Sequence, residues 1–102
     1  MLPAALIKNK LLDWSMKFKS KVYVRLRAAV DDSAGNAVRA ACAKLTDMTF
    51  NKLRLGKLIE IDFDADNEEY ANEEMEKLCK RFLANEVIED YEFTVWSEEQ
   101  WM

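Results

Sequence analysis

Alternating polar and apolar side chains mark the first regular element of the chain, over residues 17–27. One side of this segment carries Phe18, Ser20, Val22, Val24 and Leu26, and the other carries Lys17, Lys19, Lys21, Tyr23, Arg25 and Arg27. Successive side chains of a strand point to opposite faces of a sheet, so a period of two is typical of a half-buried β-strand. The pattern predicts a strand with one buried face and one largely basic face.

A helical period follows this strand. The run Asp31-Asp32-Ser33-Ala34-Gly35 forms a turn whose side chains can accept hydrogen bonds from the free amides at a helix start. Apolar residues then recur every three or four positions: Val38, Ala41, Cys42, Leu45 and Met48. This spacing predicts an amphipathic helix whose apolar stripe is buried.

Two further strands are predicted over residues 50–55 and 58–64, with Gly56-Lys57 as the hairpin between them. Glycine suits such a turn because it lacks a Cβ atom and adopts positive φ readily. The second of these strands buries Ile59, Ile61 and Phe63 on one face.

A second helix opens at Asp66-Asn67-Glu68-Glu69, where acidic side chains favour the positive end of the helix dipole. Its apolar stripe consists of Ala71, Met75, Leu78, Cys79, Phe82 and Leu83. A last strand is predicted over residues 90–96, and Val87 and Ile88 just before it are expected to seal the end of the core.

The order βαββαβ predicts an α+β, ferredoxin-like sandwich: a four-stranded antiparallel sheet with two helices on one face. The first strand then lies between the third and fourth, and its basic residues face acidic residues on both neighbours, which favours each pairing. The domain spans residues 17–96, between an N-terminal extension (1–16) and a C-terminal tail (97–102).

The extension has apolar residues at helical spacing, Ala4, Ile7, Leu11 and Trp14, which predict a short helix starting near Pro3. The alternative is that translation begins at Met16 and that the extension is not part of the natural chain.

The composition limits the classes of function that the chain can have. With 102 residues, half of them hydrophobic, the chain has room for one packed domain. A net charge of −4 argues against binding nucleic acid, and the absence of histidine excludes a His-dependent nucleophile or metal site. Cys42 and Cys79 are expected to be small buried hydrophobes. No catalytic, metal or cofactor motif is recognised, and without a membrane span or signal peptide we expect a cytoplasmic protein.

Two sets of residues are candidates for contacts with other chains. Arg54 and Lys57 flank Gly56 at the predicted hairpin tip, where they can meet a carboxylate, a phosphate or an acidic partner; the alternative is a plain turn with solvated charges. Tyr23, Leu58 and Trp96 fall on the sheet face that no helix covers, which indicates a surface for self-association.

Three segments together give a family resemblance: Val22-Tyr23-Val24-Arg25-Leu26, Arg54-Leu55-Gly56-Lys57 and the run from Leu83 to Glu92. Across roughly residues 21–96 the chain resembles the PurS family, the small subunit of phosphoribosylformylglycinamidine (FGAM) synthase. Asp32 and Gly35 match positions that this family uses in its first strand-to-helix turn, although the Pro-Gly and the second proline of the family pattern are missing here. Helix capping is the alternative role for Asp32. Glu86 stands where the family commonly has proline.

The resemblance implies a non-catalytic assembly subunit of an ATP-dependent amidoligase. It implies a PurL-type synthetase and a PurQ-type glutaminase as partners, a homodimer or higher oligomer, and help with ammonia transfer between the two active sites. The assembly converts formylglycinamide ribonucleotide, ATP and glutamine to formylglycinamidine ribonucleotide, ADP, phosphate and glutamate. Arg54, Gly56, Lys57, Asp32 and Gly35 are then the expected partner-binding residues.

The same fold admits three other classes of function. An acylphosphatase needs a glycine-rich phosphate cradle, but Arg27-Ala28-Ala29 is followed by two acids. An RNA reader stacks bases on its central strands, where this chain places Glu60, Asp62 and Asp64. A small-molecule-binding regulatory module stays open as the alternative, because such ligands are often held without a linear motif.

Overall fold

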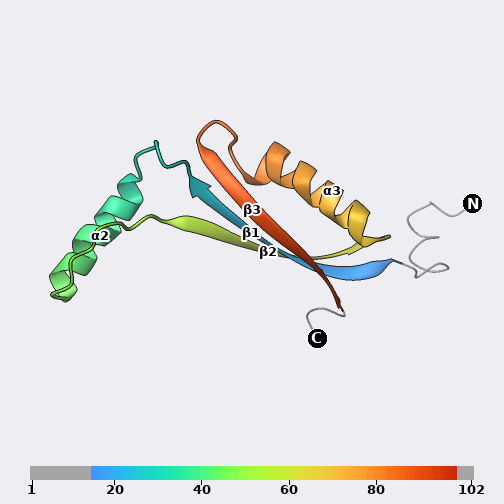
Figure 1. Ribbon diagram of the computed structural model, residues 1–102, viewed down its shortest axis with the longest axis horizontal. Helices are drawn as coiled ribbons and strands as arrows, with labels where there is room; N and C mark the ends of the chain where they lie inside the picture. The colour runs from blue at the N-terminus through green and yellow to red at the C-terminus, as the bar shows by residue number, and fades with distance from the viewer. Residues whose placement is uncertain (1–14, 99–102) are drawn as a thin grey trace, which may run out of the picture.

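The computed structural model describes residues 15–98. Its elements in chain order are β1 (Met16–Leu26), α2 (Ser33–Leu45), β2 (Gly56–Ala65), α3 (Glu68–Leu78), a π-helical turn η2 (Cys79–Leu83) and β3 (Glu89–Ser97). Figure 1 shows α3 lying along the sheet, while α2 stands away from it at the far end of the molecule.

Strand β1 is the centre of the sheet. It pairs antiparallel with β2 on one side and with β3 on the other, in the order β2-β1-β3. Phe18, Val22 and Val24 are almost wholly buried, whereas Tyr23 between them is 45% exposed, so the predicted alternation of faces is confirmed.

The charges on β1 pair as its sequence predicts. Lys17 lies 3.8 Å from Asp64 on β2, and Arg25 lies 2.7 Å from Glu92 on β3. Because these side chains are more than half exposed, each pair contributes at most about 1 kcal/mol. Burial sets the register, since a one-residue slip would bring the buried face of β1 into water.

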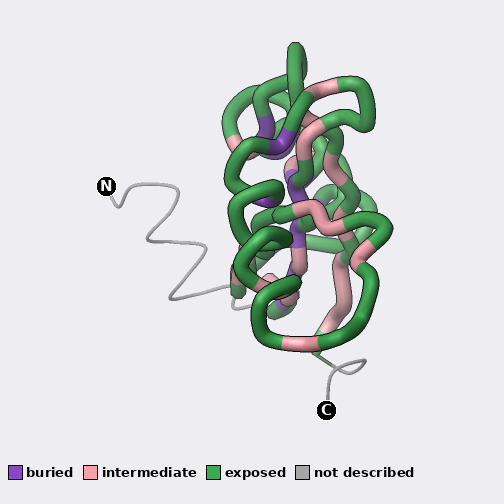
Figure 2. Tube along the Cα trace, turned by 90° about the vertical axis from the view of Figure 1, so that its left-hand side faces the viewer, coloured by how far each residue is buried: buried purple, intermediate pink, exposed green. Residues whose placement is uncertain are grey.

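Helix α3 covers the apolar face of the sheet. Asn67 caps it by accepting a hydrogen bond from the backbone N–H of Tyr70 (2.7 Å), and Glu68 and Glu69 occupy its first turn as predicted. Met75 and Cys79 pack with Val22 and Val24 in the core, and partly buried side chains of β2 and β3 surround this cluster. Figure 2 shows how few residues are buried, with most of the chain exposed.

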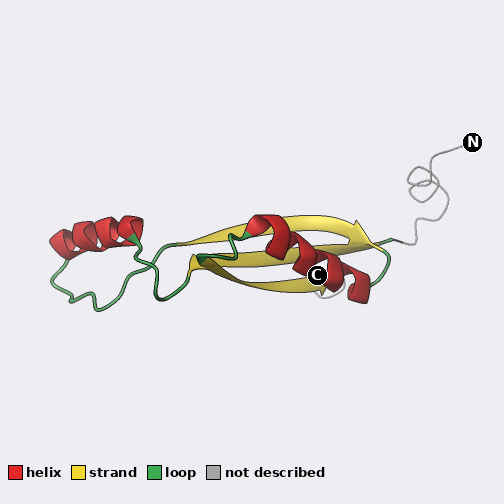
Figure 3. Ribbon diagram, turned by 90° about the horizontal axis from the view of Figure 1, so that it is seen from above, coloured by secondary structure: helices red, strands yellow, loops and turns green. Residues whose placement is uncertain are grey.

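The predicted position of the first helix is wrong. We expected two helices on one face of the sheet, but α2 projects beyond the end of the strands (Figure 3). Of α2 only Gly35 is buried, and Leu45 is 86% exposed. The helical period was correct, but it does not specify which surface covers the apolar stripe. We call residues 27–55, which leave the sheet and return to it, the arm.

The predicted four-stranded sheet is also corrected, because the described residues form three strands. Residues 50–55 run along the return of the arm and pair with no strand, so there is no hairpin at Gly56. Glycine is favoured at this position for a different reason. A Cβ atom there would lie 3.0 Å from the carbonyl oxygen of Val24, so Gly56 allows β2 to begin close against β1.

Several residues expected in the core are exposed where α3 ends. Helix α3 passes into η2, in which the backbone N–H of Ala84 bonds the carbonyl of Cys79 (3.0 Å) in place of the usual α-helical partner. The extra residue in this turn changes the direction of the side chains that follow. Cys79 stays buried, but Phe82 is 80% exposed and Val87 is 82% exposed. Leu78 and Ile88, at 39% and 38%, are exposed as well.

The predicted N-terminal helix and most of the C-terminal tail lie outside the described residues. Within residues 15–98, no helix is long and apolar enough to cross a membrane. Cys42 and Cys79 are both free, the first partly buried and the second fully buried.

Candidate partner-binding site

One carboxylate bridges the outgoing and returning sides of the arm near its base. Asp32, which is 5% exposed, caps α2 by accepting a hydrogen bond from Gly35 N–H through Oδ1 (2.8 Å). Its Oδ2 accepts a second bond from Leu55 N–H, one residue before β2 (2.7 Å). These two backbone N–H groups and the Arg54 guanidinium hold the pKa of Asp32 below its ordinary value.

Arg54 closes the same junction from the other side. Its guanidinium donates to the carbonyl oxygens of Arg27 (3.1 Å) and Val30 (2.8 Å), on the outgoing side of the arm. We call Asp32, Arg54 and their backbone partners the clasp. Because the clasp joins residues more than twenty positions apart, it sets the direction in which the arm leaves the sheet.

Gly35 is part of the clasp because nothing larger fits there. A Cβ atom at this position would lie 2.4 Å from Asp32 Oδ2 and 3.1 Å from the carbonyl oxygen of Leu53. Both carboxylate oxygens of Asp32 are already bonded within the chain. The structure thus gives Asp32 and Gly35 an internal role, while the predicted partner contact through them stays a prediction.

A hollow of about 270 Å³ lies beside the clasp, where β2 begins against the end of β1. It brings together most of the predicted site residues, being lined by Tyr23, Val24, Arg25, Arg54, Leu55, Gly56, Lys57 and Leu58. The register places Tyr23 opposite Leu58, on the open face as predicted. Trp96 shares this face but lies opposite Lys19, towards the other end of β1.

Three cations surround this hollow and have different partners. Arg25 is paired with Glu92, and Lys57 Nζ lies 3.7 Å from an Oε atom of Glu89. Arg54 has no carboxylate within ion-pair distance among the described residues and instead bonds carbonyl oxygens. The arrangement suits an acidic side chain from another protein, which would meet cations held in place by their neighbours.

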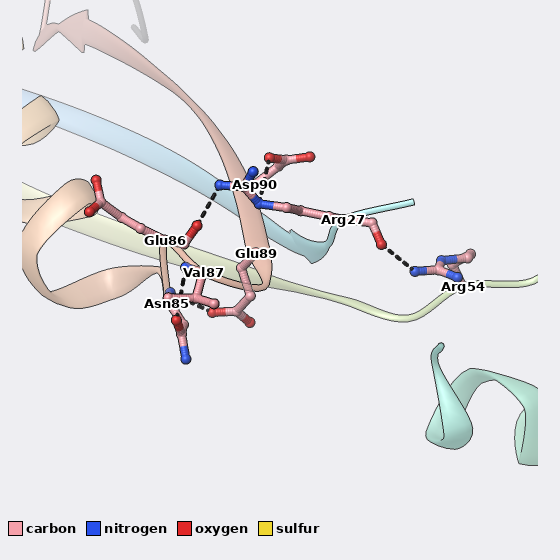
Figure 4. Close-up of polar contacts among 7 residues, drawn as sticks. All are labelled: Arg27, Arg54, Asn85, Glu86, Val87, Glu89 and Asp90. Atoms are coloured by element: carbon pink, nitrogen blue, oxygen red, sulfur yellow. Dashed lines mark hydrogen bonds and ion pairs between the residues drawn. The ribbon is translucent and has the colours of Figure 1, made fainter. Parts of the chain in front are cut away.

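The turn before β3 is joined to the base of the arm through Arg27, a residue that the sequence analysis did not single out (Figure 4). The Arg27 guanidinium donates to the carbonyl of Glu86 and lies 3.6 Å from Asp90. The Arg27 carbonyl in turn accepts from Arg54. The sequence does contain a signal for this linking role. Arg27 is the residue directly after β1, at the point where the chain leaves the sheet.

Two further titratable groups of the described residues lie where α3 and η2 meet the sheet. No group of three or more Cys, Asp or Glu among the described residues is arranged to hold a metal. Burial and the nearby Glu76 raise the pKa of the Cys79 thiol to about 11, so this buried sulfur is protonated at neutral pH. The hydroxyl of Tyr91 donates to Glu76 (2.7 Å), and this bond raises the pKa of Tyr91 to about 12. These groups tie α3 to the sheet.

Comparisons with known proteins agree on one family. Residues 19–97 match the family model PurS, described as phosphoribosylformylglycinamidine (FGAM) synthase. The chain is 36% identical over 81 residues to the PurS subunit of FGAM synthase from Synechocystis, covering 79% of this chain and 81% of the relative. It is 35% identical over 78 residues to the Bacillus subtilis subunit, covering 76% and 92%.

Solved structures of the same subunit share the fold. The PurS subunit from Thermotoga maritima superposes with a TM-score of 0.74 at 33% identity, over 80% of this chain and 94% of that one. A chain in the structure of PurLQS from the same organism gives a TM-score of 0.72 at 34% identity, over 78% and 98%.

The Asp32 carboxylate is expected to stabilise the fold above its unfolded-state pKa of about 3.9. Asp32→Asn replaces one acceptor oxygen with an NH₂ group, so one of the two backbone N–H groups loses its partner and the free energy of unfolding falls. Because the folded-state pKa is lowered, the wild-type advantage is complete above the unfolded-state value and is lost as pH falls through the folded-state value.

Urea unfolding of both proteins between about pH 7 and about pH 2.5 measures this difference. Asp31→Asn is the matched control, because Asp31 is exposed and bonds only the side chain of Asn36. A wild-type advantage over Asp32→Asn that stays constant down to the lowest pH would contradict the role given to the charge.

Proposed function

The chain belongs to the PurS family of FGAM synthase subunits, and we propose that it acts as the small assembly subunit that joins a PurL-type synthetase to a PurQ-type glutaminase. The match to a chain of the PurLQS structure, over 98% of that chain, carries the proposal. All the relatives compared are PurS subunits, so the alternative of a small-molecule-binding regulatory module is not favoured.

In this role the chain contributes surface to purine biosynthesis and leaves the chemistry to its partners. By holding the two larger subunits together, it would keep the path for ammonia between them short. The assembly would work in the cytoplasm, as the sequence analysis expects.

The arm supports a homodimer. Its helix α2 exposes Val38 and Leu45, and Met48 beyond it is 63% exposed, so nothing in residues 15–98 covers this apolar surface. The radius of gyration of 19.2 Å exceeds the roughly 13 Å typical of about a hundred packed residues. Exchange of arms between two copies would bury the stripe and complete the second helical layer.

Charge favours this pairing. The arm carries Arg39 and Lys44 on α2, whereas α3 begins with Glu68 and Glu69. A basic arm lying beside the acidic helix of a second copy brings opposite charges together. The open sheet face, with Tyr23, Leu58 and Trp96, is then free to join such dimers into a higher oligomer.

Contacts with the larger subunits would involve the hollow beside the clasp. Arg54, Gly56 and Lys57 line it, and Lys57 is the cation best placed to leave its partner, because its side chain is 64% exposed. Asp32 and Gly35 would support this contact by fixing the direction of the arm.

The central experiment is reconstitution. We expect the chain, mixed with a PurL-type synthetase, a PurQ-type glutaminase, ADP and glutamine, to co-elute in size-exclusion chromatography with light scattering. Glutamine-dependent FGAM formation should require it. Separate elution, together with equal activity when the chain is left out, would refute the assembly role.

Lys57→Ala is expected to lower stability only modestly, because Lys57 is 64% exposed and the 14% exposed carboxylate of Glu89 keeps its hydrogen bond from Asn85 N–H. Binding to the larger subunits should weaken, as measured by titration calorimetry. Lys17→Ala is the control: Lys17 is equally exposed (65%) and forms an ion pair of similar length, although with a more exposed carboxylate, and it lies away from the hollow. Arg54→Ala should weaken binding and also lower stability, since the clasp is opened. Equal affinities of Lys57→Ala and Lys17→Ala would argue against the hollow as a contact.

Charge on the arm should prevent dimerisation. Leu45→Glu with Met48→Glu places two carboxylates on the exposed stripe, and light scattering should give the mass of a single chain. Tyr23→Glu with Leu58→Glu changes the open face instead and should leave a dimer while removing larger species. A dimer that survives the arm substitutions would show that the arm is not the interface.

A further inference from the structure

Two apolar side chains at one end of the molecule are exposed to solvent. Phe82 on η2 is 80% exposed, and Val87 on the turn that follows is 82% exposed. Leu78, on α3 just before η2, and Ile88, directly after Val87, are exposed as well, and we call the four residues the η2 patch. The apolar pattern of the sequence predicted that all four would be buried, but they are exposed and add little to the core that residues 15–98 form.

The outward position of Phe82 follows from the π-helical turn. Cys79 and Ala84, joined by the hydrogen bond of that turn, are both buried, and Leu83 is partly buried. With these side chains directed at the core, Phe82 is left on the outside. Single π-helical turns inside helices are frequent at functional sites.

The turn that carries Val87 is fixed by several hydrogen bonds (Figure 4). Asn85 Oδ1 accepts from Val87 N–H (3.1 Å), the Asn85 carbonyl accepts from Glu89 N–H (2.7 Å), and Glu89 Oε1 accepts from Asn85 N–H (2.7 Å). Arg27 bonds the Glu86 carbonyl from outside the turn. An exposed apolar residue on a rigid turn loses little conformational entropy when it is covered by a partner.

Basic residues border the Phe82 side of the η2 patch, whereas the exposed Glu86 lies next to Val87. Lys80 and Arg81 lie on η2 beside Phe82 and have no carboxylate within ion-pair distance among the described residues, although the chain as a whole has a net charge of −4. A second copy's arm, with Arg39 and Lys44, would bring like charges to this border. The occupant that fits is a protein surface with an apolar socket edged by carboxylates.

We propose that the η2 patch is the anchor by which this subunit docks on a larger subunit of the synthase, with Phe82 and Val87 entering an apolar socket bordered by acidic residues. The inference rests on the proposed assembly role and adds a second contact, separate from the hollow beside the clasp. An exposed aromatic side chain with neighbouring cations is the composition found where binding energy concentrates in interfaces.

Phe82→Ser with Val87→Ser tests the anchor. Both side chains are exposed, so thermal unfolding and dimer mass should match the wild type. Affinity for the larger subunits, each titrated separately and then together by calorimetry, should fall at least about tenfold for the subunit that holds the socket. Tyr70→Ser is the control, because Tyr70 is an exposed aromatic residue (45%) on α3 but far from η2 along the helix.

Each outcome has a distinct meaning. If the wild type binds a larger subunit and the double variant binds equally well, the anchor is refuted while the assembly role stands. If the variant loses its dimer and keeps its partner affinity, the patch belongs to a second copy and the proposal is overturned. A wild type that binds neither larger subunit would refute the assembly role and the anchor together.

The acidic border is tested separately. Lys80→Glu with Arg81→Glu should slow association with the partner and remove its acceleration at low salt, because opposite charges steer the encounter. An association rate and salt dependence equal to those of the wild type would refute the acidic border.

Discussion

The alternation of side chains along β1 is the constraint on which the rest of the structure depends. Strand β1 pairs with a neighbour along both of its edges, and its buried face supplies Val22 and Val24 to the core beneath α3. Its other face carries the cations that pair with β2 and β3. A shift of one residue in either pairing would both expose the core and separate these charges. Burial and electrostatics therefore select the same register.

The core that results is small, and this explains why so much of the surface is suited to partners. One helix covers the sheet, and α2 adds almost nothing to burial within the chain. Domains of this size have little apolar burial to spare, and association with other chains is a common source of the missing stability. The arm, the open face and the η2 patch each expose apolar side chains that an assembly subunit can bury against others.

Local patterns predicted most elements well, except the strand expected over residues 50–55, and they predicted long-range placement poorly. The three strands of the sheet, the helix cap at Asn67 and the charge pairing across β1 all follow from spacing and side-chain chemistry. The position of α2 does not, because a helical period identifies an apolar face but not the chain that covers it. The sequence likewise identified Arg54 and Lys57 as cations. It did not identify the carbonyl oxygens to which Arg54 donates, because these belong to residues far away along the chain. Only coordinates reveal the π-helical turn that turns Phe82 outwards.

The clasp makes the arm a closed loop whose two ends meet at Asp32. The entropy of closing such a loop changes slowly with its length, by only about 0.6 kcal/mol for each doubling. Residues beyond the clasp can therefore be inserted or deleted during evolution with little consequence for the sheet, provided that Asp32, Gly35 and Arg54 keep their contacts. Variation in arm length would alter the reach of the subunit towards its neighbours while its folded body stays the same.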